Sequence, residues 1–221
     1  MDVTLTSGNA SVLFGARDAS NVFMWSVNTL DNEKEPLIRR HIYDRGRLQS
    51  SDTPIGKFFT KSDLLNKEHH LAIEAKDGVV KTYIDKVLVD TYTDTDSKLS
   101  NGYIGFRAFR GNNTNETAMF DNIVLTEYEQ KGDKEEAKVV LKEDFEKPQS
   151  AFEGGEIVSV GGNRKLNMVS GSGDYRVLQV DMSGVPMFRK EFKAKKKIAS
   201  ARIYSSALGV YDLFINGQRV G

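Results

Sequence analysis

The feature that most constrains this chain is the spacing of its apolar residues, which recur at every second position in short runs between turn residues. In the run 22–28, for example, Phe23, Trp25 and Val27 share one face. Such alternation is typical of half-buried strands in antiparallel sheets, whereas amphipathic helices repeat with a period near 3.6. The sequence therefore predicts an all-β protein with few helices.

Two groups of strands are expected, with turn signals between the strands of each group. Asp77-Gly78 marks a tight hairpin, and Asn216-Gly217 gives the same signal near the end of the sequence. The strands of the first group are predicted at residues 11–17, 22–28, 37–43, 71–76, 80–84, 87–92, 103–109 and 117–126, and those of the second group at residues 139–145, 156–160, 165–168, 175–182, 188–192, 198–207 and 210–215.

A charged segment separates the two groups. Residues 127–138 are rich in Glu, Lys and Asp and contain almost no apolar side chain. This change in composition is typical of a linker, although a short exposed helical turn also fits it. We therefore expect a first module at residues 1–127, a charged linker at 128–138 and a second module at 139–221.

Charge and composition argue against several classes of function. The 221 residues carry 31 Lys+Arg and 31 Asp+Glu and no cysteine. Because the charges balance, the sequence lacks the excess of basic residues that is typical of nucleic-acid-binding proteins. The lack of cysteine excludes disulfides and thiolate metal sites. The basic run 189–197 contains one aromatic residue and is expected to decorate a solvated strand face. We expect no nucleic-acid partner, no membrane span and no signal peptide in this sequence.

Candidate catalytic residues are scarce. His69 and His70 are adjacent on a predicted strand, so their side chains point to opposite faces, and His41 has no partner at strand spacing. The acidic pairs with two-residue spacing lie in turn-like polar segments rather than on apolar strands. The glycine-rich segments precede strands rather than helices, so they indicate turns rather than phosphate loops. We expect no catalytic residue, although a glycosidase built on the first module stays open as an alternative.

Aromatic and planar polar side chains offer a better candidate site, because aromatic rings contact the CH faces of sugars and planar hydrogen-bonding groups reach their hydroxyls. Trp25 shares a face with Phe23 and Val27, which favours a place in the core. Polar residues that interrupt the apolar alternation are the candidates for carbohydrate binding: Arg39, His41, Tyr43, Arg107, Arg110 and Asn112. An ordinary solvated strand face is the alternative.

The end of the sequence resembles a known family. Residues 186–192 read PMFRKEF and residues 201–221 read ARIYSSALGVYDLFINGQRVG. Together they resemble the start of the N-terminal β-sandwich domain of bacterial α-L-rhamnosidases of glycoside hydrolase family 78. The resemblance covers about the last 35 residues and implies that the second sandwich is incomplete at Gly221.

A looser resemblance covers most of residues 3–126. Its motifs are VLFGARD at 12–18, YID at 83–85, GYIGFR at 102–107 and FDNI at 120–123. They are similar to those of concanavalin A-like (laminin G-like) jelly-roll modules. Lys86 stands where that family usually has glycine after the YID motif. The resemblance implies an antiparallel jelly-roll sandwich followed by part of a second β-sandwich.

The two resemblances together imply an accessory carbohydrate-recognition region of a rhamnosidase-like glycoside hydrolase. In that family catalysis belongs to an (α/α) barrel, and none of its catalytic residues matches a position of this sequence. The expected partners are rhamnose-containing glycans and the barrel of the same full-length protein, in the periplasm or outside the cell. The alternative is a structural spacer that binds no sugar. No cofactor is expected, although Asp121 and the loop 112–115 offer oxygen ligands for calcium.

Overall fold

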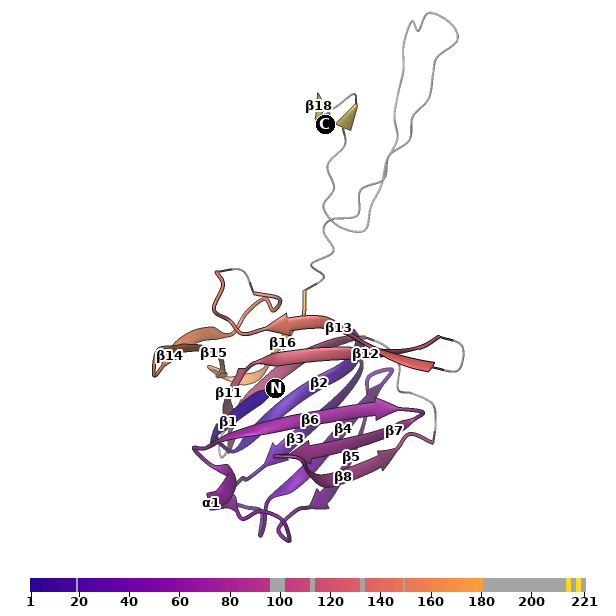
Figure 1. The fold of residues 1–221 in the computed structure, drawn as a ribbon. Coiled ribbons are helices and arrows are strands. Elements are labelled where there is room, and N and C mark those ends of the chain that lie inside the picture. The colour runs from indigo at the N-terminus through magenta and orange to yellow at the C-terminus, as the bar shows by residue number, and fades with distance from the viewer. Residues whose placement is uncertain are drawn as a thin grey trace, which may run out of the picture. The chain divides into compact units, whose positions relative to one another are not determined.

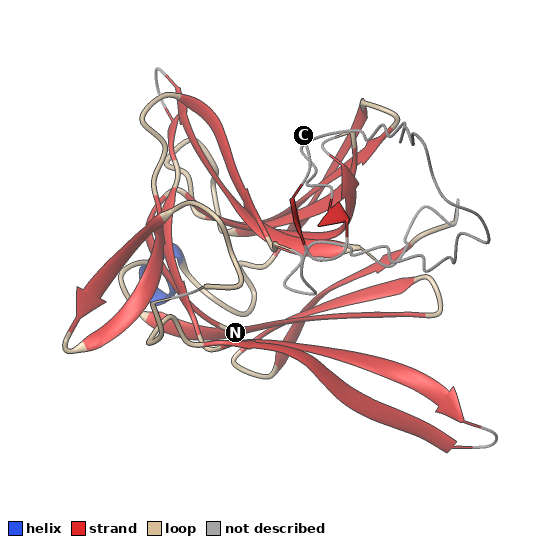
Figure 2. Ribbon diagram, turned by 90° about the horizontal axis from the view of Figure 1, so that it is seen from above, coloured by secondary structure: helices blue, strands red, loops and turns tan. Residues whose placement is uncertain are grey.

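The computed structural model describes residues 1–18, 20–95, 102–111, 114–131, 134–148, 150–180, 214–215 and 218–219. The chain divides into two compact units, Met1–Met182 and Ser183–Gly221. The described chain is 70% strand and 2% helix, which confirms the all-β class (Figure 2). Helix α1 (Lys61–Leu64) is a short turn whose Thr60 and Asp63 form a capping box.

Two large antiparallel sheets and the two-stranded β12–β13 sheet described below form the first unit (Figure 1). One sheet has the strand order β14 (Glu156–Val160), β15 (Asn163–Met168), β11 (Thr117–Asp121), β1 (Asp2–Ser7), β6 (Glu68–Lys76), β7 (Val79–Ile84) and β8 (Val87–Thr93). The other has the order β10 (Thr114–Asn115), β9 (Tyr103–Gly111), β2 (Asn9–Asp18), β3 (Asn21–Asn28), β4 (Leu37–Asp44) and β5 (Arg47–Pro54), and β16 (Gly173–Leu178) also pairs with β9.

The hydrophobic core lies between the two sheets. Phe106 of β9 and Phe120 of β11 are both fully buried, and their ring centroids are 4.2 Å apart. Trp25 of β3 is 2% exposed and contacts Tyr92 of β8 edge to face, as its apolar neighbours in the sequence suggested. Burial of large aromatic side chains from both layers is the main favourable contribution to such a sandwich.

Strands β1 and β5, and the two-residue β10, are absent from the strands predicted from the sequence. Strand β5 runs along the edge of its sheet with the sequence RLQSSDTP, and most of its residues are exposed. An edge strand with little buried surface carries no alternation, so only its pairing with β4 identifies it. Strand β1 does alternate, with Val3 and Leu5 buried, but it is only six residues long.

The charged segment 128–138, expected as a linker, lies instead in a β-hairpin. Strands β12 (Ile123–Lys131) and β13 (Lys134–Glu143) pair along their whole length. Leu125 and Leu141 near the base of the hairpin pack against the core, and the charged residues beyond them are exposed. Exposed charges on both faces of a hairpin give the same composition as a solvated linker, so composition alone does not distinguish the two.

The segment from 150 to 180 belongs to the first unit rather than to a separate second sandwich. Strand β15 pairs with β11, and β16 pairs with β9. Phe152 contacts Phe106 with ring centroids 5.2 Å apart. The division between the units therefore falls after Met182, about 55 residues later than the end of the expected first module at 127.

In the second unit, β17 (Phe214–Ile215) pairs antiparallel with β18 (Gln218–Arg219). This pairing agrees with the hairpin expected at Asn216-Gly217, although those two residues lie outside the described residues. The strands predicted at 188–192 and 198–207 lie outside them as well.

Candidate functional site

The candidate site is the face of the β2–β3–β4–β5–β9–β16 sheet that points away from the core. Alternation along β4 places Ile38, Arg40 and Ile42 toward the core and Arg39 and His41 on the opposite face. Residues that pair across antiparallel strands share a face. Through this register, one row on the outer face contains Arg39, Ser26, Ser11, Arg107 and Arg176. We call this surface the polar face.

Serine residues form the middle of the row. Ser11 and Ser26 are both buried, and their hydroxyl oxygens lie 2.7 Å apart. The two small side chains are thus shielded in the middle of the row, between the longer guanidinium side chains of Arg39 and Arg107.

At one end of the row, carboxylates hold the Arg39 side chain. Its Nε donates to Asp52 Oδ1 at 3.0 Å, and its Nη2 donates to Asp52 Oδ2 at 2.9 Å and to Glu33 Oε1 at 2.8 Å. The hydrogen bond to Asp52 raises the pKa of Arg39, and the same bond lowers the pKa of Asp52. The bidentate geometry fixes the plane of the guanidinium.

A second network occupies the other end. Arg107 Nη1 donates to Glu116 Oε2 at 2.6 Å, and its Nε donates to Asp174 Oδ1. Asp174 Oδ2 also accepts from Arg176 Nε at 2.9 Å. The Arg176 guanidinium lies over the Tyr43 ring, 5.1 Å from its centroid. One carboxylate therefore bridges two arginines whose charges would otherwise repel.

Burial raises the pKa of Glu116, although the neighbouring charge of Arg107 opposes this shift. Asn9 Nδ2 donates to Glu116 Oε1 at 3.0 Å. Burial also lowers the pKa of His41, and the positive charges of Arg107 and Arg39 lower it further. The His41 imidazole is therefore neutral at neutral pH and offers one donor and one acceptor nitrogen.

Several buried polar atoms of this face make no hydrogen bond within the described part of the chain. They are His41 Nδ1, Asn9 Oδ1 and Asn28 Nδ2. Asn9 and Asn28 pair across β2 and β3 and lie on the same side as Ser11 and Ser26. Buried polar groups normally have a partner, so the three unpaired atoms of this face mark places for water or a ligand, although, among the described residues, Trp25 Nε1 and Thr82 Oγ1 in the core are unpaired as well.

The polar face continues into an apolar end. Leu13, Ala16, Val22 and Met24 form a small buried cluster there, against which Tyr43 packs. Next to it lies a hollow of about 320 Å³, lined by Leu13, Val22, Leu178, Asp18, Glu153 and Arg176. The face thus offers apolar surface next to planar hydrogen-bonding groups.

The structure brings together four of the six residues that the sequence suggested. Arg39, His41, Tyr43 and Arg107 all lie on the polar face. Arg110 stands three residues after Arg107 on β9 and so on its other side, near the end of the strand. Asn112 lies outside the described residues.

The sequence reasoning missed the residues that complete the site. Arg176 and Asp174 come from β16, which lies in the expected second module, and Glu116 stands between two short strands. The alternation of Asp174 and Arg176 with Tyr175 and Val177 was the available signal. It could not show that β16 pairs with β9.

The remaining candidates have structural partners. Asp121 accepts from the backbone N–H of Asn122 at 2.7 Å and from Asn163 Nδ2 at 2.6 Å. His69 Nδ1 lies 2.7 Å from Asp85 Oδ2. Within the described ranges, no group of three or more His, Asp or Glu is placed to hold a metal ion. Nor does any described helix have the length and apolar character needed to cross a membrane.

Comparison with known proteins gives one family match. The family model of the alpha-L-rhamnosidase N-terminal domain matches residues 196–221. No curated protein matches the chain. The matched segment lies in the second unit and, apart from β17 and β18, outside the described residues. The match suggests an accessory region of the rhamnosidase family.

Proposed function

We propose that this chain is an accessory region of an α-L-rhamnosidase-like glycoside hydrolase and that its first unit binds rhamnose-containing polysaccharide on the polar face. The first unit would then be a concanavalin A-like jelly roll, and the second unit would be the beginning of the rhamnosidase N-terminal domain. The family match at 196–221 supports the second part of this proposal.

One observation carries the binding proposal: Arg39, His41, Tyr43 and Arg107 share a face on which buried polar atoms lack partners. Deoxyhexoses such as rhamnose present hydroxyls beside an apolar methyl group. Hydroxyls can accept from guanidinium N–H groups and donate to the fixed carboxylates, and the methyl group suits the apolar lining of the smaller hollow at Leu13, Val22 and Leu178. Arginines that carboxylates already hold lose little entropy on binding.

In this proposal the chain contributes binding and not chemistry. The catalytic (α/α) barrel would belong to the same full-length protein, which acts in the periplasm or outside the cell. Tethering a weak glycan-binding site to a catalytic domain raises the local concentration of substrate by an amount that depends on the linkage.

A structural spacer is the alternative, and a specific observation favours it: the carboxylates of the face already pair with Arg39, Arg107 and Arg176. A spacer would keep these networks only to stabilise the sheet. The two functions differ in whether the unpaired atoms of the face bind sugar.

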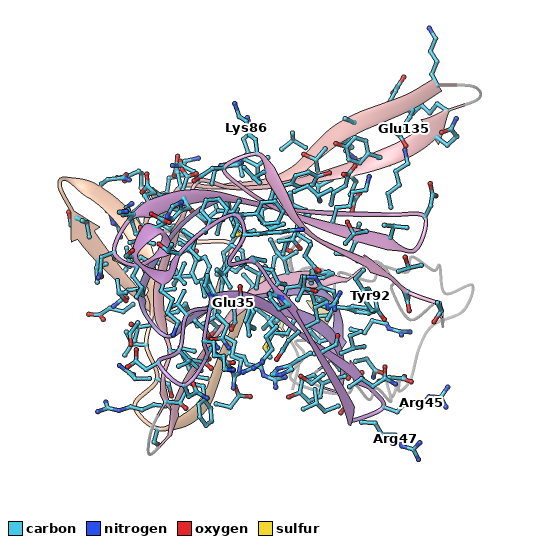
Figure 3. The ribbon with its side chains drawn as sticks, turned by 90° about the horizontal axis from the view of Figure 1, so that it is seen from below. Glu35, Arg45, Arg47, Lys86, Tyr92 and Glu135 are labelled. Atoms are coloured by element: carbon cyan, nitrogen blue, oxygen red, sulfur yellow. The ribbon has the colours of Figure 1, made fainter. Side chains whose placement is uncertain are left out.

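Calorimetric titration of the whole chain with rhamnose-containing oligosaccharides tests the proposal. We expect His41→Ala and Tyr43→Ala to weaken binding at least tenfold, about 1.4 kcal/mol, because each removes a group from the face. Arg47→Gln is the matched control, since Arg47 projects from the end of the β4–β5 hairpin (Figure 3). If the folded wild-type chain binds none of these sugars at millimolar concentration, the spacer function is correct.

A further inference from the structure

A second hollow lies at one end of the first unit, and its described lining includes none of the residues named for the polar face. Its volume is about 780 Å³, which is within the range of small-molecule sites. Four parts of the chain line it: the end of β1, the segment after β3, the turn after α1, and the paired residues of β9 and β10. Most of its polar lining consists of hydroxyl and amide side chains, from Thr6, Ser7, Thr29, Asn32, Asn66 and Asn115.

The backbone around this hollow is held in place. Thr29 Oγ1 donates to the carbonyl oxygen of Gly8 at 2.8 Å, and Ser7 Oγ donates to that of Asn115 at 2.9 Å. Gly8 has φ +68°, and a Cβ there would lie 2.6 Å from the oxygen of Asn115. Lys61 Nζ donates to the carbonyl oxygen of Glu33 at 2.8 Å and so ties down the segment after β3. The hollow is therefore preformed rather than a gap between mobile loops.

Arg110 supplies the cation of the hollow. Its side chain is exposed, and within the described part of the chain it forms no ion pair, unlike Arg39 and Arg107. A guanidinium with free N–H groups binds a carboxylate in bidentate fashion. Asp31 also lines the hollow and can accept from hydroxyl groups.

The described lining contains no aromatic ring. The hollow therefore lacks the flat apolar platform on which the CH face of a neutral sugar would stack. One cation, one anion and many hydroxyl and amide groups instead match a ligand that carries a carboxylate together with several hydroxyls. Sugar acids have this combination.

We propose that this hollow binds a uronic-acid unit of a polysaccharide, with its carboxylate on Arg110 and its hydroxyls on Asp31 and the amide side chains. This site is separate from the polar face and goes beyond the proposed function. A glycan that contains both sugar acids and neutral deoxysugars would then contact the module at two places.

Titration of the whole chain with trigalacturonic acid tests the inference, and maltotriose is the neutral probe of the same length. We expect binding of the acidic probe, at least tenfold weaker binding of maltotriose, and weaker binding of the acid at higher salt. Arg110→Gln should reduce affinity for the acid at least tenfold, whereas Arg47→Gln should leave it unchanged. Equal affinity for both probes, no binding of the acid at millimolar concentration, or an unchanged Arg110→Gln variant would each overturn the inference.

Two further variants separate this site from the polar face. Asn66→Gly removes an amide from the lining at a position with φ +57°, which glycine tolerates, and should weaken binding of the acid a few-fold. His41→Ala should leave binding of the acid unchanged, and Arg110→Gln should leave any binding of neutral rhamnosides unchanged. Loss of acid binding in His41→Ala would assign the acid to the polar face instead.

Discussion

Arg107 Nη1 lies 2.6 Å from Oε2 of Glu116, and both side chains are almost completely shielded from solvent, with 13% and 6% exposed. The pair connects β9 to the segment between β10 and β11. Because a buried carboxylate is stable only with a partner, loss of this contact would leave Glu116 as a buried unpaired charge whenever it is ionised.

Arg107→Met should destabilise the first unit more at pH 8 than at pH 4. A carboxyl group whose pKa is raised on folding contributes stability below its ordinary pKa of 4.5, and this contribution is lost as the pH rises through the raised value. Without Arg107, ionised Glu116 would be a buried unpaired charge that costs about 3 kcal/mol. Urea unfolding at the two pH values measures the difference. The double variant Arg107→Met/Glu116→Gln should recover most of the loss, and an equal loss at both pH values would contradict this assignment.

His41 should stay neutral in the folded protein at pH values where exposed histidines are protonated. Burial and the charges of Arg107 and Arg39 lower its pKa below 6.5. The unfolded chain then takes up a proton before the folded chain does, so this group makes stability fall as the pH drops through 6.5 toward the lowered value. NMR titration of the imidazole protons gives the pKa directly. His41→Gln should flatten this part of the stability profile, and a midpoint of 6.5 or above would show that the prediction is wrong.

Removing one partner of the ion pair between Arg40 and Asp90 should cost more stability than replacing both partners. Arg40 Nη1 lies 3.3 Å from Asp90 Oδ1 between the two sheets, where Tyr92 also lies (Figure 3). Asp90→Ala leaves a largely buried cation unpaired and should cost about 3 kcal/mol. The double variant Arg40→Met/Asp90→Leu should lose much less. A double-mutant cycle in urea measures the coupling, and additive losses would mean that the two charges do not interact.

The first unit should fold only when residues up to about 182 are present. Phe152 is 5% exposed and contacts Phe106, so Phe152→Ala should destabilise the unit by about 3 kcal/mol. A fragment that ends at residue 127 lacks β15 and β16. Strand β11 then loses its partner β15, and β9 loses its partner β16. Circular dichroism and thermal unfolding of fragments 1–127 and 1–182 compare them. Cooperative unfolding of the shorter fragment with equal stability would restore the boundary that the sequence suggested.

Much of the sheet structure was predictable because it depends on local alternation. The period-two pattern identified β2, β3, β4 and β6 to β9. Strand β5 was not predicted, because an edge strand buries little surface and shows no alternation. The β12–β13 hairpin had the composition of a linker, because both of its faces are exposed to solvent. Local patterns report burial, and they say nothing about which strand lies next to which.

The candidate site also has one part that the local sequence pattern predicts and another part that depends on strand pairing. The sequence by itself determined that Arg39, His41 and Tyr43 share one face of a strand, because strand geometry places alternate residues on one side. Only the tertiary structure decided that Arg107, Arg176 and Glu116 join them and that Arg110 does not. Pairing between β9 and β16 joins residues more than 60 positions apart, and the free energy that selects this pairing comes from burying Phe106, Phe152 and Val177 in one core.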